Sequence, residues 1–122
     1  MRLFVLYFAL VLTVRAEIPV PPFTGYVVDQ AGMFTAEERE ALSAKLKRFE
    51  ESGLGQMAVL TVPSLEGEPI ERFGMRVAET WKPGSKKKDD GLILIIARDD
   101  RALRFEVGYG LEERVPDIVA NR

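Results

Sequence analysis

The sequence predicts one α/β domain in which a mixed β-sheet lies between helices, in a three-layer arrangement. Three observations lead to this fold class. Residues 56–62, 69–81 and 91–97 read as strand, helix and strand, the order of a βαβ unit with parallel strands and a right-handed crossover. Residues 91–97 (GLILIIA) are apolar without a break, as in a central strand covered on both faces. Only the polar residues 98–101 separate that strand from the next, 103–107, so these two strands should form an antiparallel hairpin.

The first 16 residues have the pattern of a secretory signal peptide. Met1 and Arg2 form a positive start, residues 3–14 are an apolar run, and the tripeptide ending in Ala16 is an acceptable cleavage site. The run is short for a transmembrane helix, which needs about 20 residues, although an uncleaved anchor is the alternative. We therefore expect an exported protein, periplasmic or extracellular, with a membrane tether in the full-length form as the alternative.

The next elements can be placed in order from their turn and cap residues. Residues 17–24 contain three prolines, so they should form an extended linker rather than a helix. Residues 25–29 (GYVVD) read as a short edge strand at the start of the domain, which we place at 25–122. Thr35 and Glu38 have capping-box spacing, which predicts a helix over residues 36–52.

The remaining helices are marked by prolines. Pro69 suits the first position of a helix that ends at Trp81, because Ile70, Phe73 and Val77 share one helical face with that tryptophan. Pro116 suits the start of a last helix over residues 116–122. Little chain follows it, so we expect the domain to be incomplete at its C-terminus, with further helices truncated.

The chain contains no histidine and no cysteine, and this excludes several classes of site. No Ser-His-Asp or Cys-His nucleophile system can be assembled, nor a zinc, copper or iron site built from His or Cys. Any metal must be a hard cation held by oxygen, such as calcium, magnesium or manganese. There is no disulfide partner, and a net charge of -2 offers no basic footprint for nucleic acid.

Acidic residues and glycines should meet at one end of the predicted hairpin. Asp89 and Asp90 precede Gly91 at the start of one strand, and residues 108–113 follow the end of its antiparallel neighbour. Antiparallel pairing brings these two ends together. Carboxylates that converge beside bare backbone are suited to an oxygen-only cation site. The candidate metal ligands are Asp29, Asp89, Asp90 and Glu112, and the candidate positions of close backbone approach are Gly91, Gly108 and Gly110.

Other interpretations of these residues stay open. Asp-Asp-Gly before a strand is also ordinary turn chemistry. Lys86, Lys87 and Lys88 are typical of a solvated loop, and alternatively, together with Arg104, they would attract an anionic group such as phosphate.

Taken together, these motifs resemble the TPM domain family, which occurs in exported bacterial proteins and in a thylakoid-lumen protein of photosystem II repair. The resemblance spans about residues 25–122. The residues that carry it are an apolar segment ending in Asp29, then Thr35-Ala36-Glu37-Glu38, residues 56–62 with Ser64-Leu65-Glu66-Gly67, Trp81 and Gly84, Asp89-Asp90-Gly91-Leu92-Ile93-Leu94, and Arg104–Glu112.

The resemblance implies a single α/β domain that follows a signal peptide and is commonly tethered by a downstream transmembrane segment. The family also carries a phosphatase label and a divalent-cation site of acidic residues. The resemblance implies that the matching acidic residues of this chain are Asp29, Asp89, Asp90 and Glu112.

Two functions follow as expectations. The favoured one is an exported cation-binding module that docks onto a membrane protein complex or another envelope protein. The alternative is a divalent-cation-dependent acid phosphatase acting on a phosphorylated small molecule. In that case Asp89 and Asp90 would hold calcium or magnesium, and the basic residues would draw the phosphate.

Overall fold

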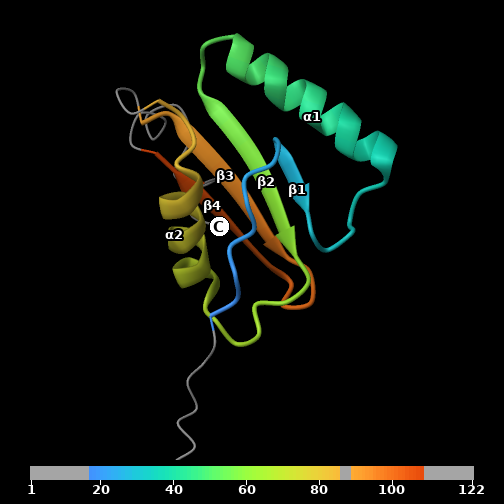
Figure 1. Ribbon diagram of the computed structural model, residues 1–122, viewed down its shortest axis with the longest axis vertical. Coiled ribbons are helices and arrows are strands. Elements are labelled where there is room, and N and C mark those ends of the chain that lie inside the picture. The colour runs from blue at the N-terminus through green and yellow to red at the C-terminus, as the bar shows by residue number, and fades with distance from the viewer. Residues whose placement is uncertain (1–16, 86–88, 109–122) are drawn as a thin grey trace, which may run out of the picture.

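The computed structural model describes residues 17–85 and 89–108 (Figure 1). The predicted bounds agree with the observed ones within two residues. The predicted signal peptide, residues 1–16, and the predicted last helix, residues 116–122, lie outside the described residues. The elements in chain order are β1 (Val27–Asp29), α1 (Ala36–Glu51), β2 (Gln56–Val62), α2 (Ile70–Trp81), β3 (Gly91–Ala97) and β4 (Ala102–Val107).

The strands form a four-stranded mixed sheet in the order β1-β2-β3-β4. β1 is parallel to β2, and β2 is parallel to β3, with Gln56 opposite Gly91. β3 and β4 are antiparallel, with Leu92 opposite Val107. The βαβ unit and the hairpin are therefore confirmed.

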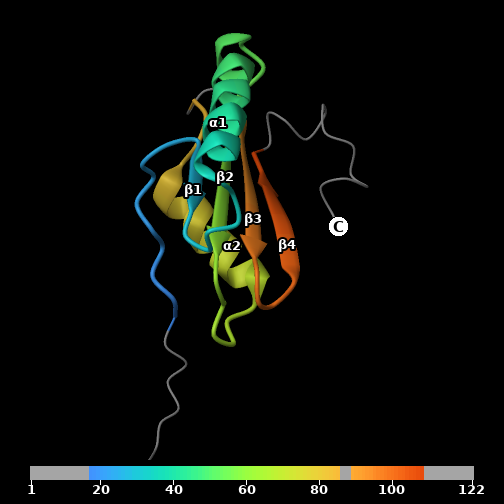
Figure 2. The same cartoon turned by 90° about the vertical axis from the view of Figure 1, so that its right-hand side faces the viewer.

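The sheet lies between two helices, which confirms the α/β class and the three layers. Figure 2 shows α1 in front of the sheet and α2 behind it. The core on the α2 face is the larger of the two and includes Leu60, Phe73, Val77, Ile93 and Ile95, all fully buried. The core on the α1 face is built from Val27, Leu46 and Val59, with partly buried neighbours.

Local sequence explains where the helices begin and end. Thr35 and Glu38 form the predicted capping box, because the Thr35 hydroxyl accepts from the Glu38 N–H and the Glu38 carboxylate accepts from the Thr35 N–H. Pro69 lies one position earlier than predicted: it is the N-cap of α2, in an extended conformation. Lys82 ends α2 in the left-handed conformation. Neither helix in the described ranges combines the length and the hydropathy needed to cross a bilayer.

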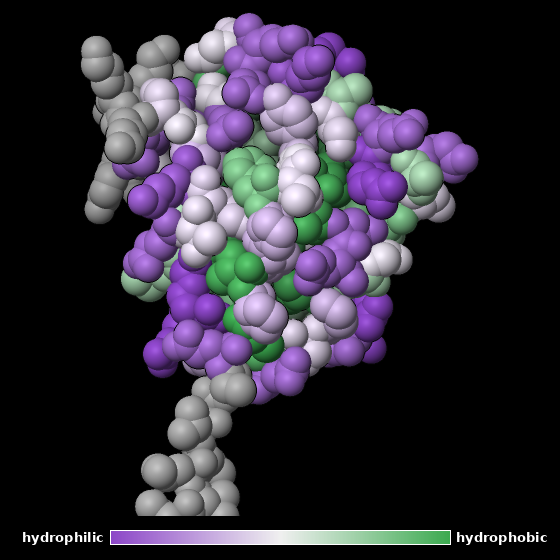
Figure 3. Space-filling view, viewed as in Figure 1, coloured by the Kyte–Doolittle hydropathy of each residue, from purple (hydrophilic) through white to green (hydrophobic). Residues whose placement is uncertain are grey.

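The segment before β1 is extended, but it packs against the domain rather than lying outside it as a linker. Ile18 is buried in the α2-face core. The Trp81 indole N–H donates to the Pro21 carbonyl oxygen at 2.7 Å, and Phe23 stacks on the Trp81 ring with 4.6 Å between centroids. Figure 3 shows apolar residues gathered in a band along the course of this segment, with hydrophilic residues around the outline of the face. Burial of these side chains is the reason that a proline-rich segment is held in place.

Candidate functional site

The end of the hairpin where β3 begins brings Asp89, Asp90 and Gly91 beside Gly108. The Gly108 N–H donates to the Gly91 carbonyl oxygen at 2.8 Å. A Cβ added to Gly108 would overlap the Asp89 carbonyl oxygen, and a Cβ added to Gly91 would overlap the Pro83 carbonyl oxygen. The absence of side chains at these two glycines is therefore what permits the loops to meet.

Asp90 is used to build the turn. Its Oδ1 accepts from the Ser85 N–H at 2.9 Å, and its carbonyl oxygen accepts from the Gln56 N–H at 3.0 Å. Gln56 in turn accepts from the Gly84 N–H through Oε1 at 2.7 Å. Asp90 is buried. Asp90 therefore holds the loop after α2 against the starts of β2 and β3. For Asp90 the interpretation as a turn residue is the one that these contacts support.

Asp89 has a different environment, because it lines a pocket of about 430 Å³. The pocket lies between the C-terminal end of α2, the loop that follows it, and the facing ends of β3 and β4. Its ionisable and hydroxyl residues are Lys82, Ser85, Asp89 and Glu106. Two carboxylates, an ammonium and a hydroxyl around one hollow are suited to a small polar or charged ligand.

Two residues of this pocket have unusual backbone conformations. Lys82 has φ 45° and Asp89 has φ 46°, so both lie in the left-handed region. That region costs a non-glycine residue roughly 1–2 kcal/mol, less for aspartate, whose short side chain tolerates it. For Lys82 this is the usual conformation of the residue that ends a helix, and for Asp89 it belongs to the turn in which the Asp89 N–H donates to the Ser85 carbonyl oxygen.

Asp29 does not join Asp89 and Asp90. β1 is parallel to β3, so the C-terminal residue of β1 and the residues before β3 lie at opposite ends of the sheet. Asp29 is opposite Thr61 and Gly91 is opposite Gln56, five positions along β2, or about 17 Å. The expectation that Asp29 would complete the acidic group is therefore wrong, because β1 runs parallel to β3 and places Asp29 at the opposite end of the sheet.

The Asp29 carboxylate stabilises its own turn instead. It accepts from the Thr61 hydroxyl at 2.6 Å and from the N–H groups of Met33 and Phe34, both at 2.9 Å. Burial acts to raise the pKa of Asp29, but these hydrogen bonds and the charge of Arg39 outweigh it, so that its pKa lies below the ordinary value. The observed contacts of Asp29 therefore hold its turn together and join that turn to Thr61 of β2.

Arg104 lies away from the start of β3, because it is opposite Ile95. Its guanidinium forms an ion pair with Glu106 over Gly74 of α2, where a Cβ would collide with the Glu106 carboxylate. The other predicted anion-binding residues, Lys86, Lys87 and Lys88, lie outside the described residues, as do Gly110 and Glu112.

The described part of the chain holds no group of three or more carboxylates that would suit a metal ion. Asp89 and Glu106 line one pocket, but calcium takes 6–8 oxygen ligands. A cation there would need further oxygens from water, from backbone or from residues beyond Gly108.

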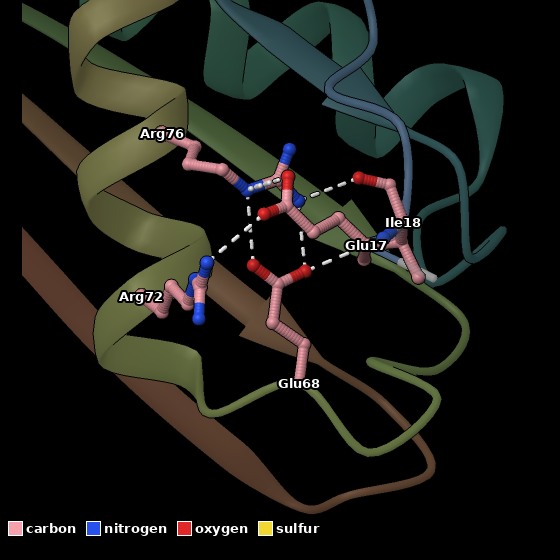
Figure 4. Close-up of polar contacts among 5 residues, drawn as sticks. All are labelled: Glu17, Ile18, Glu68, Arg72 and Arg76. Atoms are coloured by element: carbon pink, nitrogen blue, oxygen red, sulfur yellow. Dashed lines mark hydrogen bonds and ion pairs between the residues drawn. The ribbon is translucent and has the colours of Figure 1, made fainter. Parts of the chain in front are cut away.

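A buried ionic cluster at the other end of α2 was not predicted from the sequence (Figure 4). Glu68, with a side chain only 4% exposed, accepts from the Arg76 guanidinium at 2.7 and 3.0 Å and from the Ile18 N–H at 3.3 Å. Arg76 also donates to the Ile18 carbonyl oxygen at 2.6 Å. The hydrogen bonds from Arg76 lower the pKa of Glu68. Glu17 adds an exposed ion pair with Arg72 at 3.1 Å. The cluster fastens the N-terminal segment to α2.

No spacing rule in the sequence would have revealed this cluster. Glu68 and Arg76 are eight positions apart, so they are not one-turn neighbours on a helix. Glu68 stands before α2 and contacts a segment 50 residues earlier in the chain. The only available signal was an acidic residue next to a proline that starts a helix.

Comparisons with known proteins agree with this fold. The TPM domain family model matches residues 27–122. The solution NMR structure of the N-terminal domain of a protein from P. gingivalis is similar, with a TM-score of 0.71 and 36% sequence identity. The match covers 79% of this chain and 61% of that one, so this chain spans about three fifths of its length. The comparison with curated proteins gave no match. On the strength of the family match, the chain belongs to the TPM domain family.

Proposed function

We propose that this TPM domain is the cation-binding interaction module of an exported protein, and that it docks onto a membrane protein complex or another envelope protein. The observation that carries the proposal is the position of Asp89. This residue lines a pocket together with Glu106, and the backbone around it is held by the contact with Gly108.

The chemistry of the pocket favours a hard divalent cation, calcium or magnesium. Its candidate ligands are oxygens, since the chain has no histidine or cysteine. In this proposal Asp89 holds the ion, Glu106 shares its carboxylate between Arg104 and the ion, and Glu112, which follows β4 in the sequence, adds a further carboxylate. Asp90 supports the site by fixing the turn rather than by contacting the ion, because its Oδ1 already accepts from Ser85.

Binding is favoured over catalysis for a chemical reason. Without histidine or cysteine, the most common activated nucleophiles and general bases are missing. Export is supported by the signal-peptide pattern of the first 16 residues. An interaction module needs only a shaped and charged surface, and the pocket with its bordering loops supplies one.

One observation favours a second candidate, a divalent-cation-dependent acid phosphatase. Lys82 and Ser85 line the same pocket as Asp89. An ammonium and a hydroxyl beside a cation-binding carboxylate are suited to a phosphoryl group, and the cation would polarise a phosphoryl oxygen and activate water. The substrate would then be a phosphorylated small molecule.

A thermal melt tests the cation proposal. The protein is melted in EDTA and then in excess calcium, magnesium or manganese. A cation at 100 times its Kd should stabilise the fold by about 2.7 kcal/mol. Asp89→Asn should abolish this shift, because asparagine tolerates the left-handed backbone but lacks the charge. The control Glu79→Gln removes an exposed carboxylate from α2, outside the pocket, and should keep the shift.

Two outcomes would decide against the proposal. If no cation shifts the melt of the unaltered protein, the pocket is not a cation site. If Asp89→Asn shifts as the unaltered protein does, the cation binds elsewhere. Hydrolysis of a phosphomonoester that needs the same cation and is lost in Asp89→Asn would replace binding by the phosphatase alternative.

A further inference from the structure

The strand β4 forms one edge of the sheet, and among the described residues no strand lies on its outer side (Figure 2). The opposite edge strand, β1, is only three residues long. β4 has six residues and contains no proline. An edge strand presents unpaired N–H and C=O groups, which can pair with a strand of another chain. Of the two edges, β4 is therefore the one that is long enough to accept a further strand.

The register of the hairpin fixes which backbone groups of β4 point outward. Along an antiparallel pair, residues whose N–H and C=O groups bond to the neighbouring strand alternate with residues whose groups point away from it. The Gly108 N–H donates to the Gly91 carbonyl oxygen, so the even-numbered residues of β4 are those that bond to β3. The backbone groups that point to the free edge belong to Leu103, Phe105 and Val107.

The side chains of β4 alternate between the two faces of the sheet. On the α2 face, Arg104 and Glu106 are two positions apart, and both lie beside Gly74. They carry opposite charges and form an ion pair with each other. The other face carries the apolar side chains of Leu103, Phe105 and Val107, and Leu103 is 44% exposed. The edge therefore combines an apolar face with a face that bears one charge of each sign.

We propose that β4 is the interface of a homodimer, in which the edges of two copies pair antiparallel about a two-fold axis at Phe105. In this register Arg104 is opposite Glu106 of the partner subunit, and Leu103 is opposite Val107 of the partner subunit. The two-fold axis repeats both contacts, as in every isologous interface. All the outward backbone groups identified above then face the groups that they can bond to.

The charges of the edge favour this register over its neighbours. An axis at Arg104 would place the two Arg104 side chains opposite each other, and an axis at Glu106 would do the same for the two carboxylates. Like charges directly opposite each other are destabilising, whereas opposite charges attract. Charged residues on an edge strand commonly prevent association. Here their order along the strand excludes the neighbouring registers and allows the one centred on Phe105.

Charge exchange tests the pairing, with the full chain in EDTA so that no cation takes part. Sedimentation equilibrium should show the unaltered protein associating to twice the mass of one chain. Arg104→Glu sets like charges opposite each other on both sides of the axis, so the dimer dissociation constant should rise about tenfold or more. Arg104→Glu combined with Glu106→Arg in one chain should restore the dimer, because it exchanges the charges and keeps their intrachain pair. Lys47→Glu, at an exposed residue of α1, is the control and should leave the dimer unchanged.

Two outcomes would overturn the proposal. A protein that stays monomeric at its highest soluble concentration has an edge that is covered by something other than a second copy. Association that Arg104→Glu leaves unchanged, or that the double exchange does not restore, uses another surface. Circular dichroism verifies that each variant is folded.

A single thiol tests the register independently, because the chain has no cysteine. In the proposed dimer the two copies of residue 105 are directly opposite, with Cα atoms about 5.5 Å apart, a separation that a disulfide spans. Mild oxidation of Phe105→Cys should therefore give a crosslinked dimer on a non-reducing gel. Leu103→Cys is the control, because its two copies would lie about 13 Å apart along the strands. Crosslinking of Leu103→Cys as strong as that of Phe105→Cys would overturn the register.

Discussion

The two ends of β3 carry the same dipeptide and use it differently. Asp99-Asp100 follows the strand and belongs to the hairpin turn: Asp100 accepts from the Leu65 N–H at 2.9 Å, and Asp99 forms an exposed ion pair with Arg98. Asp89-Asp90 precedes the strand. There Asp90 also fixes a loop, but Asp89 lines the pocket.

The difference shows that the sequence alone does not tell whether an acidic residue holds a loop or lines a site. Its hydrogen-bond partners must be known first. At the C-terminal ends of the parallel strands, the carboxylates of Asp29 and Asp100 accept from backbone N–H groups, and Glu68 nearby accepts from Arg76. These carboxylates hold loops in place. At the opposite end, Asp89 has a left-handed backbone and lines the pocket. Substitution of a carboxylate or glycine at either end should therefore cost more stability, the more contacts that residue makes with the rest of the fold.

The largest effect is expected for Glu68→Ala. This substitution removes the buried carboxylate that binds Arg76 and the Ile18 N–H, so it weakens the attachment of the N-terminal segment to α2. Because Arg76 is partly exposed, we expect a loss of about 2–4 kcal/mol in the free energy of unfolding, at the lower end of what breaking a buried pair costs. Urea denaturation measures it. Glu71→Ala, an exposed acidic residue of the first turn of α2, is the control and should change stability by less than about 0.5 kcal/mol. Similar losses in both variants would mean that the cluster is not structural.

The next effect is expected for Gly108→Ala at the pocket end. The added Cβ would collide with the Asp89 carbonyl oxygen, so the loops must separate. Overpacking of this kind costs about 1–3 kcal/mol, and the cation-induced shift in melting temperature should weaken with it. Gly25→Ala is the matched control, since a Cβ there meets no atom within 4 Å. Equal melting temperatures of the two variants would contradict the close approach.

A smaller effect separates the two residues of the hairpin turn. Asp100→Ala removes the acceptor of the Leu65 N–H, and Leu65 is buried. We expect a loss of about 1 kcal/mol. Asp99→Ala removes only an exposed ion pair and should cost less than about 0.5 kcal/mol. Chemical denaturation of both variants checks the order, and a reversal would show that the exposed pair matters more than the backbone contact.

The smallest effect is expected in the pH dependence of the melting temperature below about pH 5. The folded-state pKa values of Asp29 and Glu68 are lowered, so each carboxylate stabilises the fold above its unfolded pKa of about 4, and this contribution is lost as pH falls through the folded value. The melting temperature should therefore be steady from pH 7 to about 5 and begin to fall near 4. In Asp29→Asn the fall should be shallower. Identical pH profiles would show that Asp29 contributes nothing to it.

Much of the fold was predictable because its signals are local. The apolar run of residues 91–97 and the short polar link after it predict a buried strand and a hairpin, and both are observed. The capping box at Thr35 and the prolines around α2 placed the helices within a residue or two. The hairpin also placed Asp89 and Asp90 next to Gly108, since an antiparallel pair leaves no freedom about which ends meet.

The sequence by itself thus determined the elements, the βαβ order and the acidic pair at the start of β3. Only the tertiary structure decided that Asp29 lies at the far end of the sheet, that Glu68 binds Arg76, and that Asp90 is a turn residue while Asp89 lines the pocket. The physical reason is range: caps, turns and hairpins join residues a few positions apart, whereas strand direction and the Glu68 contact with Ile18 join segments about 30 to 50 positions apart. No short pattern records contacts of that separation, because packing of the whole chain creates them.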